Sequence, residues 1–317
     1  MARGLARGLL RGVVGLAGAF VLWLLAVWPP PVWYATHWPA ETAFQEMRRK
    51  SAGTQERRGA ETRGRTLGVG TLDPPCAPAP LRPCVRLYHP VPLDSIAPAM
   101  VSAAMAGEDQ RFRQHSGIDW VNLRHALGYP RDDFSWTSPR DRRDLWRALP
   151  RAWSRRDRLR GASTITQQLA KNLYLSPSRN PLRKVKEAVT AWRLERALGK
   201  DRIMELYLNT VELGPEVWGV DAASRKYFGH PAARLSLSEA AELAGALPFP
   251  LRSNPAYRPG RMLHRQQLIL LHLRGAPVEI PPDTESTETA DSVIPAPPVE
   301  SLPPLDSFPP VPDSLGG

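Results

Sequence analysis

Two short segments of this 317-residue chain carry side chains that could do chemistry. Residues 107–117 read G-E-D-Q-R-F-R-Q-H-S-G and offer the carboxylate of Glu108, which could act as a general base. Residues 161–172 begin 44 positions after the end of that run and read G-A-S-T-I-T-Q-Q-L-A-K-N. There, two adjacent glutamines and Lys171 fall within about one helical turn of one another. The two segments therefore offer a group that can accept a proton and groups that can bind an anion.

A third segment is cationic. Arg179 lies just ahead of a predicted helix start at Asn180–Pro181, where backbone N–H groups and the helix dipole favour negative charge. Arg183 and Lys184 follow in that helix, with Glu187 on the same face. A phosphate or pyrophosphate would suit this arrangement. Taken alone, the same residues would be explained as a solvated ladder of ion pairs.

The remaining polar residues of 107–117 have ordinary explanations when taken singly. A carboxylate at a helix end, such as Glu108, usually faces water. Asp109 beside it could be a hydrogen-bonding turn residue. His115 could be a metal ligand or a base, or it could pack and orient the loop. The combination of motifs is more informative than any one of them.

Helix-start and helix-stop signals predict a mainly helical domain around these segments. Thr164 with Gln167, and Ser236 with Glu239, have the spacing of a capping box, and no stretch alternates as a strand would. We expect helices over Thr42–Lys50, Ser95–Gly107, Thr164–Leu175, Asn180–Leu198 with Gly199 as its stop, Asp201–Val211 with Asp201 as its cap, Ser236 to just before Pro248, and Arg261–Arg274.

Residues 128–160 form an arginine-rich surface excursion that contains Trp136, Trp146 and Trp153. The favoured interpretation is a solvated insertion whose tryptophans are tucked against the core. The alternative is an amphipathic segment that contacts a membrane.

The charge is distributed unevenly. The formal net charge is +11, but from Gly275 onward there are eight acids and no Lys or Arg. The preceding residues therefore hold all 42 basic residues against 23 acids. Such a body suits an anionic partner, namely nucleic acid, anionic lipid or a phosphorylated substrate. The Pro-rich acidic tail, residues 275–317, is expected to be disordered.

The N-terminus predicts a membrane anchor. Gly12 to Trp28 contains no charged residue, and three arginines precede it, which favours the N-terminus inside and the body outside. A cleaved signal peptide is the alternative, but no small-x-small site follows and Pro29–Pro31 would obstruct cleavage. We therefore expect a retained anchor. The tryptophans near its end would suit an interfacial belt: Trp23, Trp28, Trp33 and Trp38.

Cys76 and Cys84 would then lie in an oxidising compartment, in a Pro-rich loop. We expect a disulfide between them, with two free thiols as the alternative. Two cysteines alone do not indicate a metal site.

Five motifs in order give the chain a family resemblance. They are E-D-x-x-F-x-x-H-x-G (Glu108, Asp109, Phe112, His115, Gly117), G-x-S-T-I-T-Q-Q-x-x-K-N (Gly161–Asn172), R-K-x-x-E (Arg183, Lys184, Glu187), Y-L-N (Tyr207–Asn209) and Y-F-G (Tyr227–Gly229). With these motifs the chain resembles the family 51 peptidoglycan glycosyltransferases, specifically the monofunctional biosynthetic type, from about Thr42 to Arg274. No Ser-x-x-Lys motif of a penicillin-binding transpeptidase follows.

The resemblance implies a fold and an activity. The fold would be a mainly α, lysozyme-like glycosyltransferase domain of two lobes with a cleft between them. The enzyme would polymerise lipid II: the 4-hydroxyl of lipid II attacks the anomeric carbon of a glycan chain held on undecaprenyl pyrophosphate, with inversion. The partners would be lipid II, the lipid-linked glycan, membrane lipid and proteins of cell-wall elongation or division, but not nucleic acid.

The resemblance also implies roles for individual residues. Glu108 would be the general base, Lys171 and Arg179 would contact the donor pyrophosphate, and Glu187 would be a second essential glutamate that orders the phosphate site or a divalent ion (Mg²⁺ or Mn²⁺). Other cleft residues implied by analogy are Ser163, Thr164, Gln167, Gln168, Asn172, Arg183 and Lys184, with Asp109, Phe112, His115 and Asn209 in support.

These inferences divide the chain into three parts. Residues 1–40 would hold a cytoplasmic stub, a single transmembrane helix and an interfacial segment, residues 41–274 the enzyme on the periplasmic side of the inner membrane, and residues 275–317 the tail. Two other functions remain open: a lysozyme-like muramidase or lytic transglycosylase, and a non-enzymatic membrane-tethered scaffold. An inverting hydrolase would need a second carboxylic acid to protonate an alcohol leaving group, whereas a pyrophosphate needs cations. The cationic segment therefore favours transfer.

Overall fold

The computed structural model describes residues 2–50, 87–126, 134–154, 163–175, 181–278 and 280–281. The predicted disulfide between Cys76 and Cys84, the predicted anion contact Arg179, the helix cap Asn180 and the tail from residue 282 onward lie outside the described residues.

The described residues are mainly helical, as the sequence predicts. Besides a helical segment over residues 43–50, the α-helices are α1 (Ala2–Leu25), α3 (Pro98–Glu108), α4 (Trp120–Ala126), α5 (Pro139–Ser154), α6 (Ile165–Tyr174), α7 (Pro181–Ala197), α8 (Lys200–Thr210), α9 (Val220–Phe228), α10 (Leu237–Ala246) and α11 (Gly260–Leu273). Short 3₁₀ turns are η1 (Pro31–Ala35), η2 (Leu93–Ser95), η3 (Phe112–Gln114) and η5 (Ala232–Arg234), and the strands are β1 (Leu87–Tyr88), β2 (Glu212–Gly214) and β3 (Val217–Trp218).

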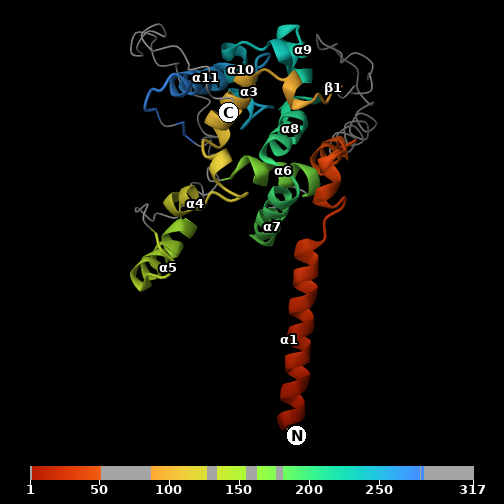
Figure 1. Cartoon of the computed structure of the whole chain (residues 1–317), viewed down its shortest axis with the longest axis vertical. Coiled ribbons are helices and arrows are strands. Elements are labelled where there is room, and N and C mark those ends of the chain that lie inside the picture. The colour runs from red at the N-terminus through yellow and green to blue at the C-terminus, as the bar shows by residue number, and fades with distance from the viewer. Residues whose placement is uncertain are drawn as a thin grey trace, which may run out of the picture.

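Two groups of packed helices form the body. Helix α3 packs against α10 and α11, and α6 packs against α7 and α8 (Figure 1). The end of α3 reaches α6 through the hydrogen bond from Gln168 to Glu108. One continuous hydrophobic core joins them, and it includes Met100 of α3, Leu169 of α6 and Leu206 of α8. The segments that hold the predicted chemical groups therefore lie at the join between the two groups.

Helix α1 projects from one end of the body (Figure 1) and contacts α7 at its base. There, Arg193 donates a hydrogen bond to the carbonyl of Leu25, and the Lys186 ammonium lies 4.7 Å from the centre of the Trp23 ring. In the part of the chain that the structure describes, no helix has both the length and the apolar character required to span a bilayer.

Capping contacts explain where several helices begin. The backbone N–H of Gln167 donates to Thr164 Oγ1, and the N–H of Thr164 donates to Gln167 Oε1, both at 3.2 Å. Ser236 and Glu239 form the same reciprocal pair at the start of α10. Both predicted capping boxes are confirmed, and each orients a helix of the core.

The prediction that Asp201 caps α8 is wrong. The cap is Gly199, and Asp201 lies in the first turn of the helix, where its carboxylate is 3.1 Å from Arg113. Gly199 has φ −75°, so it does not end α7 in the left-handed conformation. An acidic residue in the first turn also interacts favourably with the helix dipole. The sequence pattern therefore places the cap two positions too late in the chain.

A small sheet with the order β1-β3-β2 is the one strand feature of the described residues that the sequence did not predict. Strand β1 pairs in parallel with β3, and β2 pairs antiparallel with β3. Each strand has only two or three residues, too few to show polar–apolar alternation. The sheet leads into α9 through Gly219.

Gly219→Ala should destabilise the fold. Gly219 has φ +84°, and a Cβ at this position would lie 2.7 Å from the carbonyl oxygen of Asn209. We expect a loss of at least about 1–3 kcal/mol in the free energy of unfolding, measured by chemical denaturation. Gly199→Ala is the matched control, because nothing lies within 4 Å of the added Cβ. Equal stability of the two variants would contradict the argument.

The described tryptophans of the arginine-rich excursion are not tucked against the core. Trp136 is 64% exposed and Trp146, on α5, is 71% exposed. The interpretation that they pack inward is therefore wrong for these two residues. In the described part of this stretch, Pro139–Ser154 form α5, which projects beside α4 away from the helices of the core (Figure 1).

Candidate active site

Glu108 is the last residue of α3, and two other helices hold its carboxylate. Oε2 accepts a hydrogen bond from Gln168 Nε2 of α6 at 2.9 Å, and Oε1 lies 3.1 Å from Arg265 Nη2 of α11. The side chains of Glu108 and Arg265 are only 10% and 9% exposed. The carboxylate is thus held in one orientation between two partners.

Gln168 is itself oriented by Tyr207, whose hydroxyl donates to Gln168 Oε1 at 3.1 Å. Burial raises the pKa of Tyr207 well above its usual value, and the charge of Glu108 adds to the shift. The phenol therefore keeps its proton and remains a donor. This fixes the amide of Gln168 so that its N–H group points at Glu108.

Arg265 is the main site residue that sequence analysis missed. Its guanidinium donates to the carbonyl of Gly107 and, through Nη1, to the carbonyl of Pro281 at 2.7 Å. One signal was available. Arg265 lies on the same face of α11 as the buried Met262 and Ile269, and an arginine on a buried face needs an acceptor or a counter-ion.

Arg265→Leu should destabilise the domain, because it leaves the Glu108 carboxylate buried without its cation. Removing one member of a buried pair costs roughly 3–5 kcal/mol. Chemical denaturation of Arg265→Leu, Glu108→Gln and the double variant would measure the coupling. The double variant should lose less stability than the sum of the single losses. Additive losses would show that the pair is not an energetic unit.

Lys171 lies one helical turn from Gln168 on α6, so it shares that residue's side of the helix. Burial lowers the pKa of Lys171. The negative charge of Glu187 and, more weakly, that of Glu108 oppose this shift, while Lys184 and Arg183 add to it. The ammonium therefore interacts with both glutamates and with two other cations.

Glu187, on α7, is the anionic centre of that cationic cluster. Its side chain is 3% exposed, Oε2 lies 3.1 Å from Arg183 Nη1, and Oε1 accepts from Lys184 Nζ. Lys184 also donates to Ser163 Oγ at 3.2 Å, which ties α7 to the start of α6. Because Arg183 and Lys184 already place two positive charges against the carboxylate of Glu187, their repulsion disfavours a divalent ion at this position.

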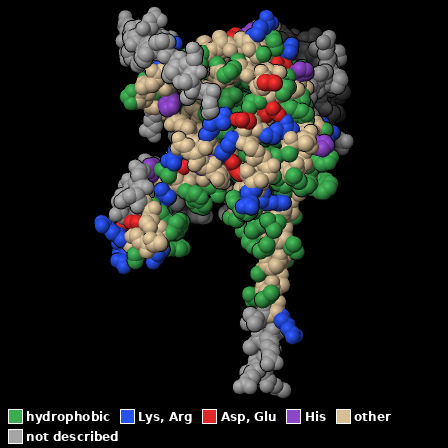
Figure 2. Space-filling model, in the orientation of Figure 1, with side chains coloured by type: hydrophobic (Ala, Val, Ile, Leu, Met, Phe, Trp, Pro, Cys, Tyr) green, Lys and Arg blue, Asp and Glu red, His purple; other side chains and the backbone are tan. Residues whose placement is uncertain are grey.

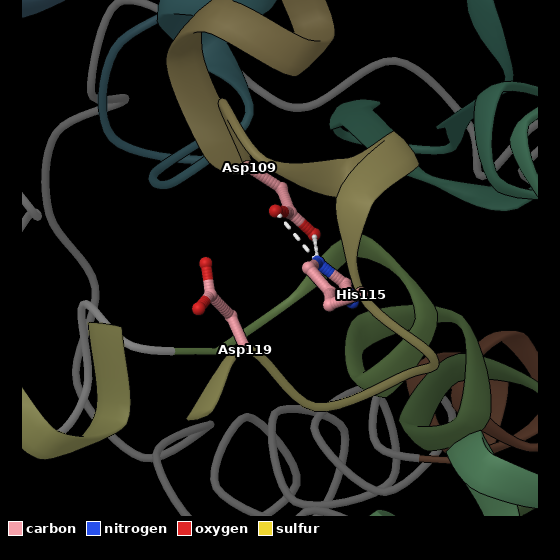
Figure 3. Close-up of side chains that lie close together, drawn as sticks. All are labelled: Asp109, His115 and Asp119. Atoms are coloured by element: carbon pink, nitrogen blue, oxygen red, sulfur yellow. Dashed lines mark hydrogen bonds and ion pairs between the residues drawn. The ribbon is translucent and has the colours of Figure 1, made fainter. Parts of the chain in front are cut away.

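Asp109 and His115 organise the loop that follows Glu108. His115 Nε2 lies 3.0 Å from both carboxylate oxygens of Asp109, and Asp109 Oδ2 also accepts from the backbone N–H of Ile165 at 3.0 Å (Figure 3). Asp109 thereby links the segment that carries Glu108 to the N-terminus of α6. The sequence allows His115 to be a metal ligand, a base, or a residue that orients the loop. Its contacts with Asp109 support orientation of the loop.

Asp119 completes a group with metal-ligand spacing, since ligand atoms of Asp109, His115 and Asp119 lie within 4.8 Å of one another (Figure 3). Each carboxylate is nevertheless already engaged. Asp119 Oδ1 caps α4 by accepting from the N–H groups of Val121 and Asn122, and Oδ2 faces Arg111 Nε at 3.6 Å. Asp109 and Asp119 Oδ1 are therefore engaged within the protein, whereas the buried Asp119 Oδ2 forms no hydrogen bond with the described residues and faces only the Arg111 guanidinium.

The other predicted site residues fall into the scaffold of the site. Phe112 is buried with the Lys200 ammonium 4.3 Å from its ring centre. Asn209 hydrogen-bonds the backbone N–H and carbonyl of Val91, both at 2.8 Å. Three more are buried in or beside α6: Thr164, Gln167 and Asn172.

A pocket of 720 Å³ opens beside the cationic cluster around Glu187, and none of the described residues of that cluster lines it. It lies between residues 111–121 and one face of α7, and its apolar wall includes Val185, Val189 and Trp192. Neither Glu108 nor Lys171 lines it. The site of interest is therefore the surface shared by the end of α3, α6 and the start of α7.

Comparison with known proteins identifies the family. A model described as transglycosylase matches residues 132–274. A biosynthetic peptidoglycan transglycosylase of Azoarcus sp. is 33% identical over 277 residues, 87% of this chain and 98% of that protein. One from Bordetella pertussis is 37% identical over 238 residues, 75% of this chain and 79% of that protein. Penicillin-binding protein 1A of Escherichia coli is 41% identical over 181 residues, 57% of this chain and 19% of that protein.

A buried, oriented carboxylate lies beside a cationic cluster, and the relatives show that the protein that carries it is a glycosyl-transferring enzyme. The chain belongs to the transglycosylase family, that of the biosynthetic peptidoglycan transglycosylases. The resemblance seen in the motifs is confirmed. The family model begins after Glu108, so the role of that residue rests on the motif and on its geometry.

Proposed function

We propose that this enzyme polymerises lipid II into a β-1,4-linked glycan strand, with inversion at the anomeric carbon and release of undecaprenyl pyrophosphate. The observation that carries the proposal is the placement of Glu108 and Lys171. The partner of Glu108, Gln168, lies one turn from Lys171 on the same helix, and the two charges act on each other.

In the proposed reaction, Glu108 takes the proton of the acceptor's 4-hydroxyl as that oxygen attacks the anomeric carbon of the donor. A carboxylate offers about four acceptor positions, and Gln168 and Arg265 use two of them. The others can face a sugar hydroxyl. Because Gln168 and Arg265 come from separate helices, the base is held rigidly while the substrate moves.

The bond between the anomeric carbon and the pyrophosphate breaks as the new bond forms, and the electrons pass to the phosphate oxygen. Lys171, Arg183 and Lys184 would stabilise the developing charge. Glu187, whose own side chain is 3% exposed, pairs with both Arg183 and the half-exposed Lys184 and so pre-positions them. We assign Arg179 to the same cluster on its motif alone. No acid is required, because pyrophosphate leaves without protonation.

We further propose that α1 anchors the enzyme in the inner membrane, with the N-terminus in the cytoplasm and the catalytic domain in the periplasm. Support comes from its apolar side chains, which lack a protein partner over most of their surface. Four are more than half exposed: Val13 (56%), Val14 (63%), Leu16 (75%) and Leu22 (70%). Both proposed substrates carry lipid, so an anchored enzyme meets them in two dimensions.

The decisive test is a polymerisation assay. The purified full-length protein in detergent should convert labelled lipid II into long glycan strands that a muramidase then degrades. If the protein instead shortens preformed glycan and leaves lipid II unchanged, it is a lytic enzyme. If it does neither but still binds glycan, the scaffold function replaces the proposal.

The anchor is tested by removing residues 2–25. The full-length protein should stay with membranes in alkaline carbonate, whereas the shortened protein should be released. Retention of the shortened protein would mean that another surface carries the attachment.

A further inference from the structure

Helix α5 presents exposed aromatic side chains that nothing in the described body covers. Trp146 on α5 is 71% exposed, and Trp136 just before it is 64% exposed. A tryptophan left this exposed forgoes most of the hydrophobic free energy it could gain. Two such residues within ten positions indicate a surface that is covered in the working enzyme.

The same segment is strongly basic. Residues 139–160 contain nine arginines and three aspartates. Two of the aspartates are engaged locally: Asp141 is buried and accepts from the N–H of Ser135, and Asp144 lies 3.9 Å from Arg147. The arginines whose exposed side chains the structure describes are Arg140, Arg142, Arg143 and Arg147.

The position of α5 suggests what covers it. Helix α5 projects from the body on the side from which α1 leaves (Figure 1). Lys and Arg side chains lie on the outer side of this projection, and hydrophobic side chains lie on the side toward α1 (Figure 2). A bilayer that holds α1 would therefore lie close to α5.

We propose that α5, together with Trp136, is a second membrane contact that lies on the bilayer surface and binds anionic phospholipid headgroups. Exposed tryptophans suit the interface, and arginines at a negatively charged surface attract it electrostatically. The inference rests on the proposed function only for the placement of the bilayer at α1. Its consequence is that the enzyme is held at two points and cannot rotate freely about its anchor.

The acidic tail of the chain is the other candidate occupant, since residues 282–317 hold seven acids and no Lys or Arg. A bilayer accounts for more of the observations. The tail would match the arginines, but it does not explain why the helix that carries the exposed Trp146 lies on the side of the body from which α1 leaves (Figure 1). The experiment must therefore separate the two.

Hydrogen exchange on the full-length enzyme in lipid nanodiscs tests the proposal without any substitution. Amides of residues 140–148 should exchange roughly tenfold more slowly in discs that contain phosphatidylglycerol than in discs of phosphatidylcholine alone. High salt should remove the difference. Equal exchange in the two kinds of disc would overturn the proposal. The amides of α1 serve as an internal control, since their protection should be the same in both.

Two further measurements assign the cause. Arg143→Glu should abolish the lipid-dependent protection, whereas Arg234→Glu, an exposed arginine on η5 outside this surface, should leave it intact. Removal of residues 282–317 should also leave it intact. Protection that is independent of lipid and lost with the tail would mean that the tail covers α5. Glycan synthesis in the same discs reports separately on the proposed activity.

Discussion

Replacing Glu108 with glutamine should reduce glycan synthesis by about 10²–10⁴-fold while the domain stays folded. Glutamine keeps the size of the side chain and an oxygen that can accept from Gln168 or Arg265, but it cannot take a proton at neutral pH. The measurement is the initial rate of lipid II consumption by the full-length protein. Circular dichroism and thermal unfolding would verify the fold.

Glu195→Gln is the matched control for this variant. The Glu195 side chain is 8% exposed and pairs with Lys200 at 2.7 Å, and it also accepts from Thr166. Its replacement should therefore remove a buried ion pair, as in Glu108→Gln, without loss of the base. If both variants lose activity equally, the effect is structural and Glu108 is not the base. Full activity of Glu108→Gln would require another proton acceptor.

Lys171→Met should lower the rate of polymerisation by about 10²–10³-fold, the cost of removing one preorganised group that stabilises developing negative charge. The methionine side chain fills much of the same space. Lys171→Arg should retain more activity, because it keeps the charge. Lys226→Met, on the remote helix α9, is the control for loss of a lysine. If Lys171→Met lowers affinity for lipid II without lowering the maximal rate, its role is ground-state binding.

The lowered pKa of Lys171 gives the wild-type enzyme a pH dependence of defined sign. Because burial lowers the pKa of Lys171, the folded enzyme loses this charge at a lower pH than the unfolded chain does. Wild-type activity should therefore fall on the alkaline side below the usual titration range of lysine. Over the same interval the lysine's own contribution to stability should rise, since folding no longer buries an ammonium. A wild-type alkaline limit that Lys171→Met shares would exclude Lys171 as its origin.

Much of the helical framework could be predicted because its signals are local. Thr164 with Gln167 and Ser236 with Glu239 each place a capping side chain three residues from its partner, so four sequence positions suffice to locate a helix start. The motif residues around Glu108 and Lys171 were found in the same way. Each depends on neighbours in the chain.

The rest depends on contacts between distant segments. Arg265 reaches Glu108 across a separation of 157 positions, and the parallel pairing of Leu87 with Val217 has no local pattern at all. The exposed tryptophans show the converse problem. An apolar residue predicts burial, but only the arrangement of α5 relative to the core shows that the expected protein surface is missing.

The hydrogen bond from Arg265 to the Pro281 carbonyl has a practical consequence for anyone who isolates the catalytic region. Ile280 packs against the core, so the polypeptide beyond α11 closes over Arg265, which pairs with Glu108. An expressed fragment that stops at Arg274 would leave that guanidinium without one of its acceptors, and weak catalysis by such a fragment would reflect the choice of end point. A fragment that extends past Pro281 avoids this artefact.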